Sequence, residues 1–331
     1  MARVVDVHSH FLPLEVVELL REGGYPLARA VQRPEGTWIV CERGLQFELT
    51  PLFHDAGAKL EWMDAHGIDV SLTSIAAPLF LYELDVERLD ELCRQVNDAA
   101  ARLAAASDGR IVGMATVPIT QPELAAAEVR RACGELGLKG VEIGTSVGGQ
   151  VMLDDASLDP FYAAAAEAGA PVLLHPYTYM LGLQSIPGFG RFFLLNNVGN
   201  MVETHLAAAR MMLGGVFDRH PSLRVQLSHG GGGLPFQLAR LDHTYHKREA
   251  VREVAKRSPF QYLDNFLFDT VVYDPRPLRF LLELVGPERV VFGTDHPFDI
   301  ADVAGLESVR ALDGEAAEKV LHQNAARAYG I

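Results

Sequence analysis

Residues 4–11 read VVDVHSHF, a valine-rich run that carries two histidines one residue apart. The β-branched residues favour a strand over residues 4–8. Along an extended chain, residues i and i+2 point to the same side, so the imidazoles of His8 and His10 face the same way. The stretch therefore predicts a strand that presents a pair of histidines at its carboxyl end.

Similar apolar runs recur along the chain. The eight predicted strands cover residues 4–8, 70–75, 111–117, 140–145, 171–175, 224–229, 267–273 and 290–294. Amphipathic helical patterns lie between them, over residues 56–66, 86–107, 121–134, 159–168, 201–220, 234–256, 275–285 and 316–328. This alternation predicts an α/β protein with a parallel sheet, and eight strands is the number that closes a (β/α)8 TIM barrel.

Two stretches depart from the alternation. Residues 23–50 mix glycine, proline and charge with short apolar alternation, which predicts a small β insertion after strand one. We assign it to an insertion subdomain of residues 23–52 within a single domain of residues 1–331. Residues 178–197 form a long predicted loop after strand five, and loops of that length in a compact domain are usually functional.

Composition and charge narrow the class of protein. The 331 residues are 49% hydrophobic and 22% charged, which is ordinary for a globular chain. A net charge of −14 argues against a nucleic-acid or anionic-membrane surface. Cys41, Cys93 and Cys133 form no CxxC pair, and no apolar run reaches the ~18–20 residues of a membrane span. We therefore expect a cytoplasmic protein with reduced thiols.

Metal-capable side chains follow several of the predicted strands. In a TIM barrel the active site lies at the carboxyl ends of the strands. Strand five ends in LLHP, strand six in LSHGGGG and strand eight in FGTDHPF. Strand one contributes His8 and His10, and strands five, six and eight contribute His175, His229 and Asp295. Imidazoles and a carboxylate suit a divalent ion such as Zn²⁺.

The ligands and the reacting group can be assigned within this set. His8, His10, His175 and Asp295 supply four ligands and leave a position open for water or substrate. His229 is then free to act as a base, beside a glycine run that allows backbone and substrate to approach closely. Alternatively, His229 binds a second ion. We favour one ion, because predicted strand four ends in Gly144-Thr145-Ser146 and offers no bridging carboxylate.

The motifs resemble a known family. HxH after strand one, HP after strand five, HGGG after strand six and TDHPF after strand eight resemble the amidohydrolase superfamily. Within it, the chain is similar to the aminocarboxymuconate-semialdehyde decarboxylase-like branch (amidohydrolase family 2). MDAHGIDVSLTS (residues 63–74) and NAARAYGI (residues 324–331) match as well, so the resemblance runs from end to end.

The resemblance implies roles for particular residues. It implies the same four metal ligands, with His229 as the catalytic acid/base and with Asp295 as a second group that can handle a proton. It also implies a homodimer in which Arg240 reaches a substrate carboxylate across the interface. Phe298 and Phe192 match aromatic residues that line the pocket. His296 and His54 are predicted near the mouth, either as substrate contacts or as ordinary polar residues.

One departure from the family bears on the substrate. The muconate enzyme has a second carboxylate-binding arginine where this chain has Phe47, and the nearby Arg43 is out of register. Loss of a guanidinium removes a bidentate clamp for a carboxylate, so a dicarboxylated substrate is disfavoured.

The resemblance implies metal-dependent, non-oxidative decarboxylation of a small aromatic or unsaturated acid, with no organic cofactor. We expect Zn²⁺, with Mn²⁺ as the alternative. The same site could instead use a metal-activated water to hydrolyse an amide, lactone or C–C bond, or to hydrate a double bond. A barrel that binds metal without catalysis is a third reading. The strand ends alone do not separate these reactions.

Overall fold

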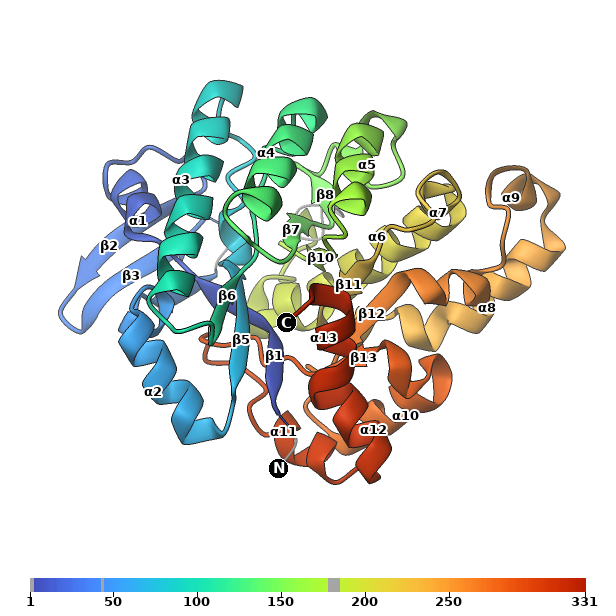
Figure 1. Ribbon diagram of the computed structural model, residues 1–331. Helices are drawn as coiled ribbons and strands as arrows, with labels where there is room; N and C mark the ends of the chain where they lie inside the picture. Colours follow the sequence, from blue (N-terminus) through green and yellow to red (C-terminus); the bar gives the residue numbers. More distant parts are fainter. Residues whose placement is uncertain (1–2, 43–44, 178–184) are drawn as a thin grey trace.

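The computed structural model describes residues 3–42, 45–177 and 185–331. Its centre is a ring of parallel strands (Figure 1). The strands are β1 (Val5–Phe11), β5 (Val70–Ile75), β6 (Ile111–Gly113), β7 (Val141–Gly144), β10 (Val172–His175), β11 (Val225–Leu227), β12 (Phe266–Asp269) and β13 (Val290–Val291).

Backbone pairing closes these strands into a barrel. They form a three-stranded sheet, β1-β5-β6, and a five-stranded sheet, β13-β12-β11-β10-β7. A bridge between Ala115 and Val141 joins the sheets on one side, and a bridge between Ser9 and His296 joins them on the other. The Val7 N–H also donates to the Phe292 carbonyl over 2.9 Å. The predicted α/β barrel is therefore confirmed.

The strands are buried along most of their length, as expected where helices cover one face and the barrel interior the other. A separate apolar cluster combines Val5, Val7, Leu173 and Leu267 with Tyr329 of the last helix. The Tyr329 hydroxyl donates to Gln226 of β11. Figure 1 shows this helix and the C-terminus in front of the ring of strands.

Helices surround the strands (Figure 1). They are α1 (Leu14–Arg21), α2 (Ala56–His66), α3 (Val86–Ala105), α4 (Pro122–Gly134), α5 (Asp159–Glu167), α6 (Met201–Leu213), α7 (Val216–Arg219), α8 (Leu234–Lys247), α9 (Glu249–Val254), α10 (Pro275–Val285), α11 (Gly305–Arg310), α12 (Gly314–Glu318) and α13 (Asn324–Tyr329). Short helical turns are η1 (Pro51–Phe53), η2 (Ala77–Leu79), η3 (Ala156–Leu158), η5 (Arg191–Phe193), η6 (Leu195–Asn200), η7 (His229–Gly231), η8 (Pro259–Asn265), η9 (Pro287–Arg289) and η10 (Lys319–Gln323). No helix in these described ranges is long and apolar enough to cross a membrane.

Several helices differ from the prediction. The pattern over 201–220 breaks into α6 and α7 because Gly215 takes the left-handed conformation, with φ 74°. The pattern over 234–256 breaks at Arg248, whose backbone is extended. The helices α1 and α11 were not predicted. Both are short, with 8 and 6 residues, so each offers few turns of periodicity to detect.

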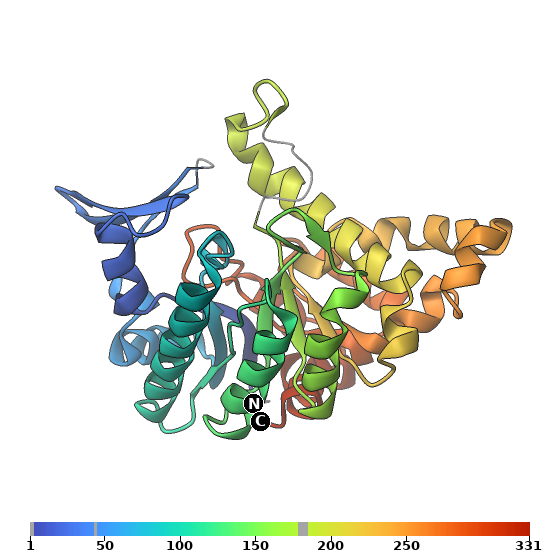
Figure 2. The same cartoon turned by 90° about the horizontal axis from the view of Figure 1, so that it is seen from above.

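The stretch after strand one contains an antiparallel sheet, in the order β2 (Ala28–Arg33), β3 (Gly36–Cys41) and β4 (Gln46–Glu48). A small hairpin, β8 (Ser146–Val147) and β9 (Val151–Met152), follows β7. The predicted loop over 178–197 is partly helical, because η5 and the π-helical η6 lead into α6; residues 178–184 lie outside the described ranges. Figure 2 shows the β2–β4 sheet and this helical segment extending from the same end of the barrel.

Candidate active site

Four metal-capable side chains from distant parts of the chain meet at the carboxyl ends of the strands. One nitrogen or oxygen atom from each of His8, His10, His175 and Asp295 lies within 4.8 Å of the others, and all four residues are buried. His10 Nε2 lies 3.0 Å from Asp295 Oδ1, and His8 Nε2 lies 3.5 Å from the same oxygen. The strand β1 runs to Phe11 and not only to residue 8 as predicted, so His10 lies inside the strand as His8 does.

The ring nitrogens of this group are arranged to bind a cation. His8 Nδ1 is 2.6 Å from Asp269 Oδ2, His10 Nδ1 is 3.1 Å from the Ile75 carbonyl, and His175 Nδ1 is 2.8 Å from the Pro176 carbonyl. Each Nδ1–H is therefore positioned to donate away from the site. Among the described residues, the buried Nε2 atoms of His8 and His175 have no hydrogen-bond partner. Imidazole Nε2 atoms beside a carboxylate are the donor set that a divalent cation takes.

The protonation states of these four residues also suit the binding of a cation. Burial opposes ionisation of Asp295, but the charge of His8 and the contacts with His10 and His229 hold its pKa well below the ordinary value. Burial, with the neighbouring histidines, lowers the pKa of His175 well below its usual range, and burial also lowers the pKa of His10. Burial opposes a charge on His8 as well, but Asp295 and Asp269 raise its pKa to about 9. Only His8 thus holds a proton that a cation has to displace at neutral pH.

His229 stands beside the ligand group. Its Nε2 is 3.3 Å from Asp295 Oδ2, and its ring centroid is 5.0 Å from that of His175. Its Nδ1 is buried and has no hydrogen-bond partner among the described residues. His229 can therefore exchange a proton with a molecule above the ligands.

The glycines after His229 shape this turn. Gly230 and Gly231 both have positive φ, at 60° and 79°. A Cβ on Gly230 would lie 2.5 Å from Val272, and one on Gly231 would lie 2.7 Å from the ring of Phe268. At these two positions the missing side chains leave room for protein neighbours.

A cavity opens above His175, His229 and Asp295. Its volume is about 120 Å³, close to the ~150 Å³ of a cavity that holds one benzene ring. Phe47 of β4, Phe193 of η5 and Phe298 after β13 contribute to its walls. The Phe298 ring packs 5.3 Å from His10 and 5.1 Å from Phe47. A second hollow of about 350 Å³ adjoins it and shares His229 and Asp295. The aromatic walls suit a flat ring.

The predicted substrate contacts divide into two groups. Phe298 lines the cavity, and Phe193 lines it in place of its neighbour Phe192, although both of these phenylalanines are mostly exposed, at 72% and 73%. His296 is buried elsewhere, because it follows the left-handed turn at Asp295 (φ 65°) and stacks on Trp62 of α2 at 3.5 Å. His54 borders a different hollow, between α1 and α3.

Arg240 also lies away from the cavity of its own chain. It is exposed on α8, and among the described residues it forms no ion pair; the nearby Asp242 lies 3.5 Å from His246 Nε2 instead. Arg43, the other arginine considered at the mouth, lies outside the described residues.

Buried acids near the ligands escaped the sequence analysis, among them Asp269 and Glu142. Asp269 ends β12 and contacts His8, whereas Glu142 of β7 has its Oε1 4.0 Å from His10 Nδ1. Burial raises the pKa of Glu142 well above its ordinary value. Strand four therefore does carry a carboxyl group, but this group faces the nitrogen of His10 that points away from the ligand site. An acid inside an apolar strand was the available signal, since such groups are rarely buried without a partner.

Comparison with known proteins identifies the class. The amidohydrolase family model matches residues 5–331, so the chain belongs to the amidohydrolase family. Within that family it falls in the decarboxylase branch of amidohydrolase family 2, as the motifs predicted. It is 29% identical to 2-amino-3-carboxymuconate-6-semialdehyde decarboxylase of Dictyostelium discoideum, over 99% of this chain and 91% of that protein. It is 34% identical to gamma-resorcylate decarboxylase of Rhodococcus jostii, over 73% of this chain and 77% of that protein.

Solved structures agree with this assignment. The chain matches 5-carboxyvanillate decarboxylase from Sphingomonas paucimobilis with a TM-score of 0.85 and 27% identity over 100% of both chains. It matches the 5-carboxyvanillate decarboxylase of Novosphingobium aromaticivorans with a TM-score of 0.84 and 25% identity, over 100% of this chain and 97% of that one. The latter structure contains manganese and 3-methoxy-4-hydroxy-5-nitrobenzoic acid. The manganese of that relative and the donor set of this chain together support a divalent-metal site.

Proposed function

We propose that the protein is a metal-dependent, non-oxidative decarboxylase of a small aromatic or unsaturated carboxylic acid. The observation that carries the proposal is that His175, His229 and the ionised Asp295 lie at the floor of an aromatic-walled cavity, with His8 and His10 clustered around the same carboxylate. The names of the relatives, all decarboxylases of this branch, support the reaction class over hydrolysis or hydration.

The residues divide the work as follows. His8, His10, His175 and Asp295 hold one divalent cation, which when bound supplies positive charge for the substrate's carboxylate and a neighbouring oxygen. Phe47, Phe193 and Phe298 hold the ring flat above the ligands. His229, steadied at Nε2 by Asp295 Oδ2, delivers a proton to the carbon that bears the carboxylate. The new C–H bond uses a ring electron pair, the C–C bond to the carboxylate then breaks, and its electrons restore the ring as CO₂ leaves.

The cavity favours an acid with a single carboxylate. Its described lining residues include no lysine or arginine, and they include Phe47, which the sequence resemblance aligns with the muconate enzyme's second arginine. A second carboxylate would lose its hydration there without gaining a cation in this chain. We therefore place monocarboxylic aromatic acids ahead of dicarboxylates.

Metal identity and assembly are further parts of the proposal. We propose one ion per subunit, with Zn²⁺ ahead of Mn²⁺ because three imidazoles and one carboxylate suit zinc. We also propose a homodimer in which Arg240 enters the partner's cavity. The exposed Phe236 on the same helix, at 79%, supports burial of this helix face against a second copy. A cytoplasmic location stays a prediction from the scattered thiols.

The test is product analysis with the purified, metal-loaded protein. A panel of hydroxylated benzoic acids, benzoic acid and dicarboxylated analogues is incubated, and CO₂ and the ring product are measured together. We expect equal amounts of both products from at least one monocarboxylic acid. Cleavage of an ester or amide panel without CO₂ release would replace the decarboxylase with a hydrolase.

A further inference from the structure

We propose that Asp269 is a positioning residue which fixes the metal ligand His8 and the acid/base His229 through a single carboxylate. The inference rests on the proposed function for the roles of those two histidines. Asp269 itself touches neither the cation nor the substrate.

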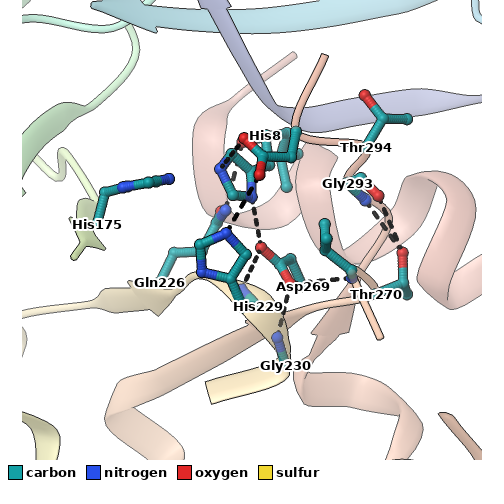
Figure 3. Close-up of polar contacts among 12 residues, drawn as sticks. His8, His175, Gln226, His229, Gly230, Asp269, Thr270, Gly293 and Thr294 are labelled. Atoms are coloured by element: carbon teal, nitrogen blue, oxygen red, sulfur yellow. Dashed lines mark hydrogen bonds and ion pairs between the residues drawn. The ribbon is translucent and has the colours of Figure 1, made fainter. Parts of the chain in front are cut away.

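Each carboxylate oxygen of Asp269 accepts two hydrogen bonds. Oδ2 accepts from His8 Nδ1 at 2.6 Å and from the His229 backbone N–H at 3.0 Å. Oδ1 accepts from the backbone N–H of Gly230 at 2.8 Å and of Val271 at 3.1 Å. Asp269 is fully buried, so these four donors replace its hydration. Figure 3 shows Asp269 between His8 on one side and His229 and Gly230 on the other.

The first consequence concerns His8. A carboxylate at 2.6 Å from Nδ1 keeps the proton on that nitrogen, so the lone pair that faces the ligand group is on Nε2. The same contact fixes the rotation of the ring. A carboxylate behind a ligating histidine also makes the imidazole a stronger donor, and losing such a partner typically costs about 10–100-fold in metal affinity.

The second consequence concerns His229. Its φ of 54° and the φ of 60° at Gly230 are successive left-handed conformations, which turn two adjacent N–H groups toward one anion. A left-handed conformation is unfavourable for a residue with a side chain and persists only where the surroundings enforce it. The Asp269 carboxylate supplies that constraint, and the His229 ring is thereby held beside Asp295.

No near-isostere can replace this aspartate. All four neighbours donate, so both oxygens have to accept. An asparagine has one oxygen and one NH₂ group, and the NH₂ group would oppose two donors in either orientation. A glutamate keeps the charge but is one methylene longer.

The experiment compares metal affinity and turnover in wild type, Asp269→Asn and Asp269→Glu. Zinc dissociation constants are measured by competition with a chromogenic chelator, and CO₂ release is measured with the metal saturating. We expect Asp269→Asn to bind zinc about 10–100-fold more weakly and to turn over more slowly even when saturated, because the His229 turn is released. Glutamate should recover part of the affinity. The matched control is Asp218→Asn, another mostly buried carboxylate that accepts from Tyr262 and Lys256 but lies outside the site.

A direct readout covers the case in which Asp269→Asn does not fold. In zinc-loaded wild type labelled with ¹⁵N-histidine, His8 should show an Nδ1–H proton shifted downfield by its carboxylate partner. An Nε2–H tautomer of His8, or wild-type zinc affinity in a folded Asp269→Asn protein, would overturn the positioning role. Absence of CO₂ release by zinc-loaded wild type would instead overturn the proposed function and leave the affinity comparison intact.

Discussion

At the scale of single residues, His229 has a left-handed backbone conformation, which is unfavourable for a residue with a side chain. Its neighbours impose that conformation. The φ of 54° at this position follows from the carboxylate of Asp269 and from the glycines that come next. The site therefore depends on residues that never meet a substrate. Three predictions belong to this scale.

Replacing His229 by alanine should remove turnover and keep the metal. The ring contacts Asp295 but is not one of the four clustered ligands, and a positioned proton donor contributes about 10²–10⁴-fold to a rate. Metal content is measured by mass spectrometry and turnover by CO₂ release. His322→Ala, in η10, serves as the control. Loss of the metal together with activity would mean that His229 is a ligand.

Gly293→Ala should disturb the ligand site without changing any ligand. A Cβ at this position would lie 2.8 Å from the Cβ of His8 and 3.2 Å from that of Asp269, so these two residues would have to move apart. Overpacking of this kind costs about 1–3 kcal/mol of the free energy of unfolding. We expect a lower melting temperature and weaker zinc binding. Gly314→Ala meets no atom within 4 Å and should change neither quantity.

Metal binding at pH 7.5 should release about one proton per ion. The pKa of His8 is raised to about 9, so His8 is protonated in the metal-free protein, whereas the lowered pKa values of His10 and His175 leave those rings neutral. Affinity should therefore rise about tenfold per pH unit and level off above about pH 9. Calorimetry in buffers of different ionisation enthalpy counts the protons. A count near zero or near two would contradict the assignment.

At the scale of elements, the insertion after β1 completes the cavity. Phe47 on β4 is buried between Phe53 and Phe298, at 5.0 Å and 5.1 Å. Phe47→Ala should raise KM about tenfold with a smaller change in kcat, because it removes part of the cavity lining and a ring that packs against Phe298. Steady-state kinetics on the best acid from the panel measure both. Trp38→Ala, in the same sheet but packed against Arg33, should leave KM unchanged if the effect is local.

How far the sequence predicts this molecule depends on how local each feature is. The barrel strands follow from apolar runs, and the convergence of His8, His10, His175 and Asp295 follows from the rule that parallel strands end at one face. The contact between His8 and Asp269 spans 261 positions, and no local pattern encodes it. Whether a side chain next to a ligand faces the cavity also depends on contacts with distant parts of the chain. The sequence analysis placed Phe192 and His296 near the substrate, but neither of them lines the cavity.

At the scale of the whole molecule, the exposed face of α8 bears on assembly. If Arg240 serves the partner's cavity, Arg240→Ala and His229→Ala should each be nearly inactive alone. In a two-fold dimer with two equivalent shared sites, a mixed pair has one intact site. Equal mixing with free exchange should therefore restore roughly a quarter of wild-type activity. CO₂ release after co-incubation, with light scattering to verify the dimer, measures this. No recovery from mixed dimers would place Arg240 outside the shared site.

The closure of the barrel by its first and last strands also has a consequence for biosynthesis. Asp295 lies 285 positions after His10 in the chain. At translation rates of about 5–20 residues per second, the ribosome adds it roughly 15 to 60 s after the histidine. During that interval the nascent polypeptide carries the early ligands without the carboxylate that completes their set. The full set of four ligands can therefore assemble only after the last strand of the barrel has been synthesised.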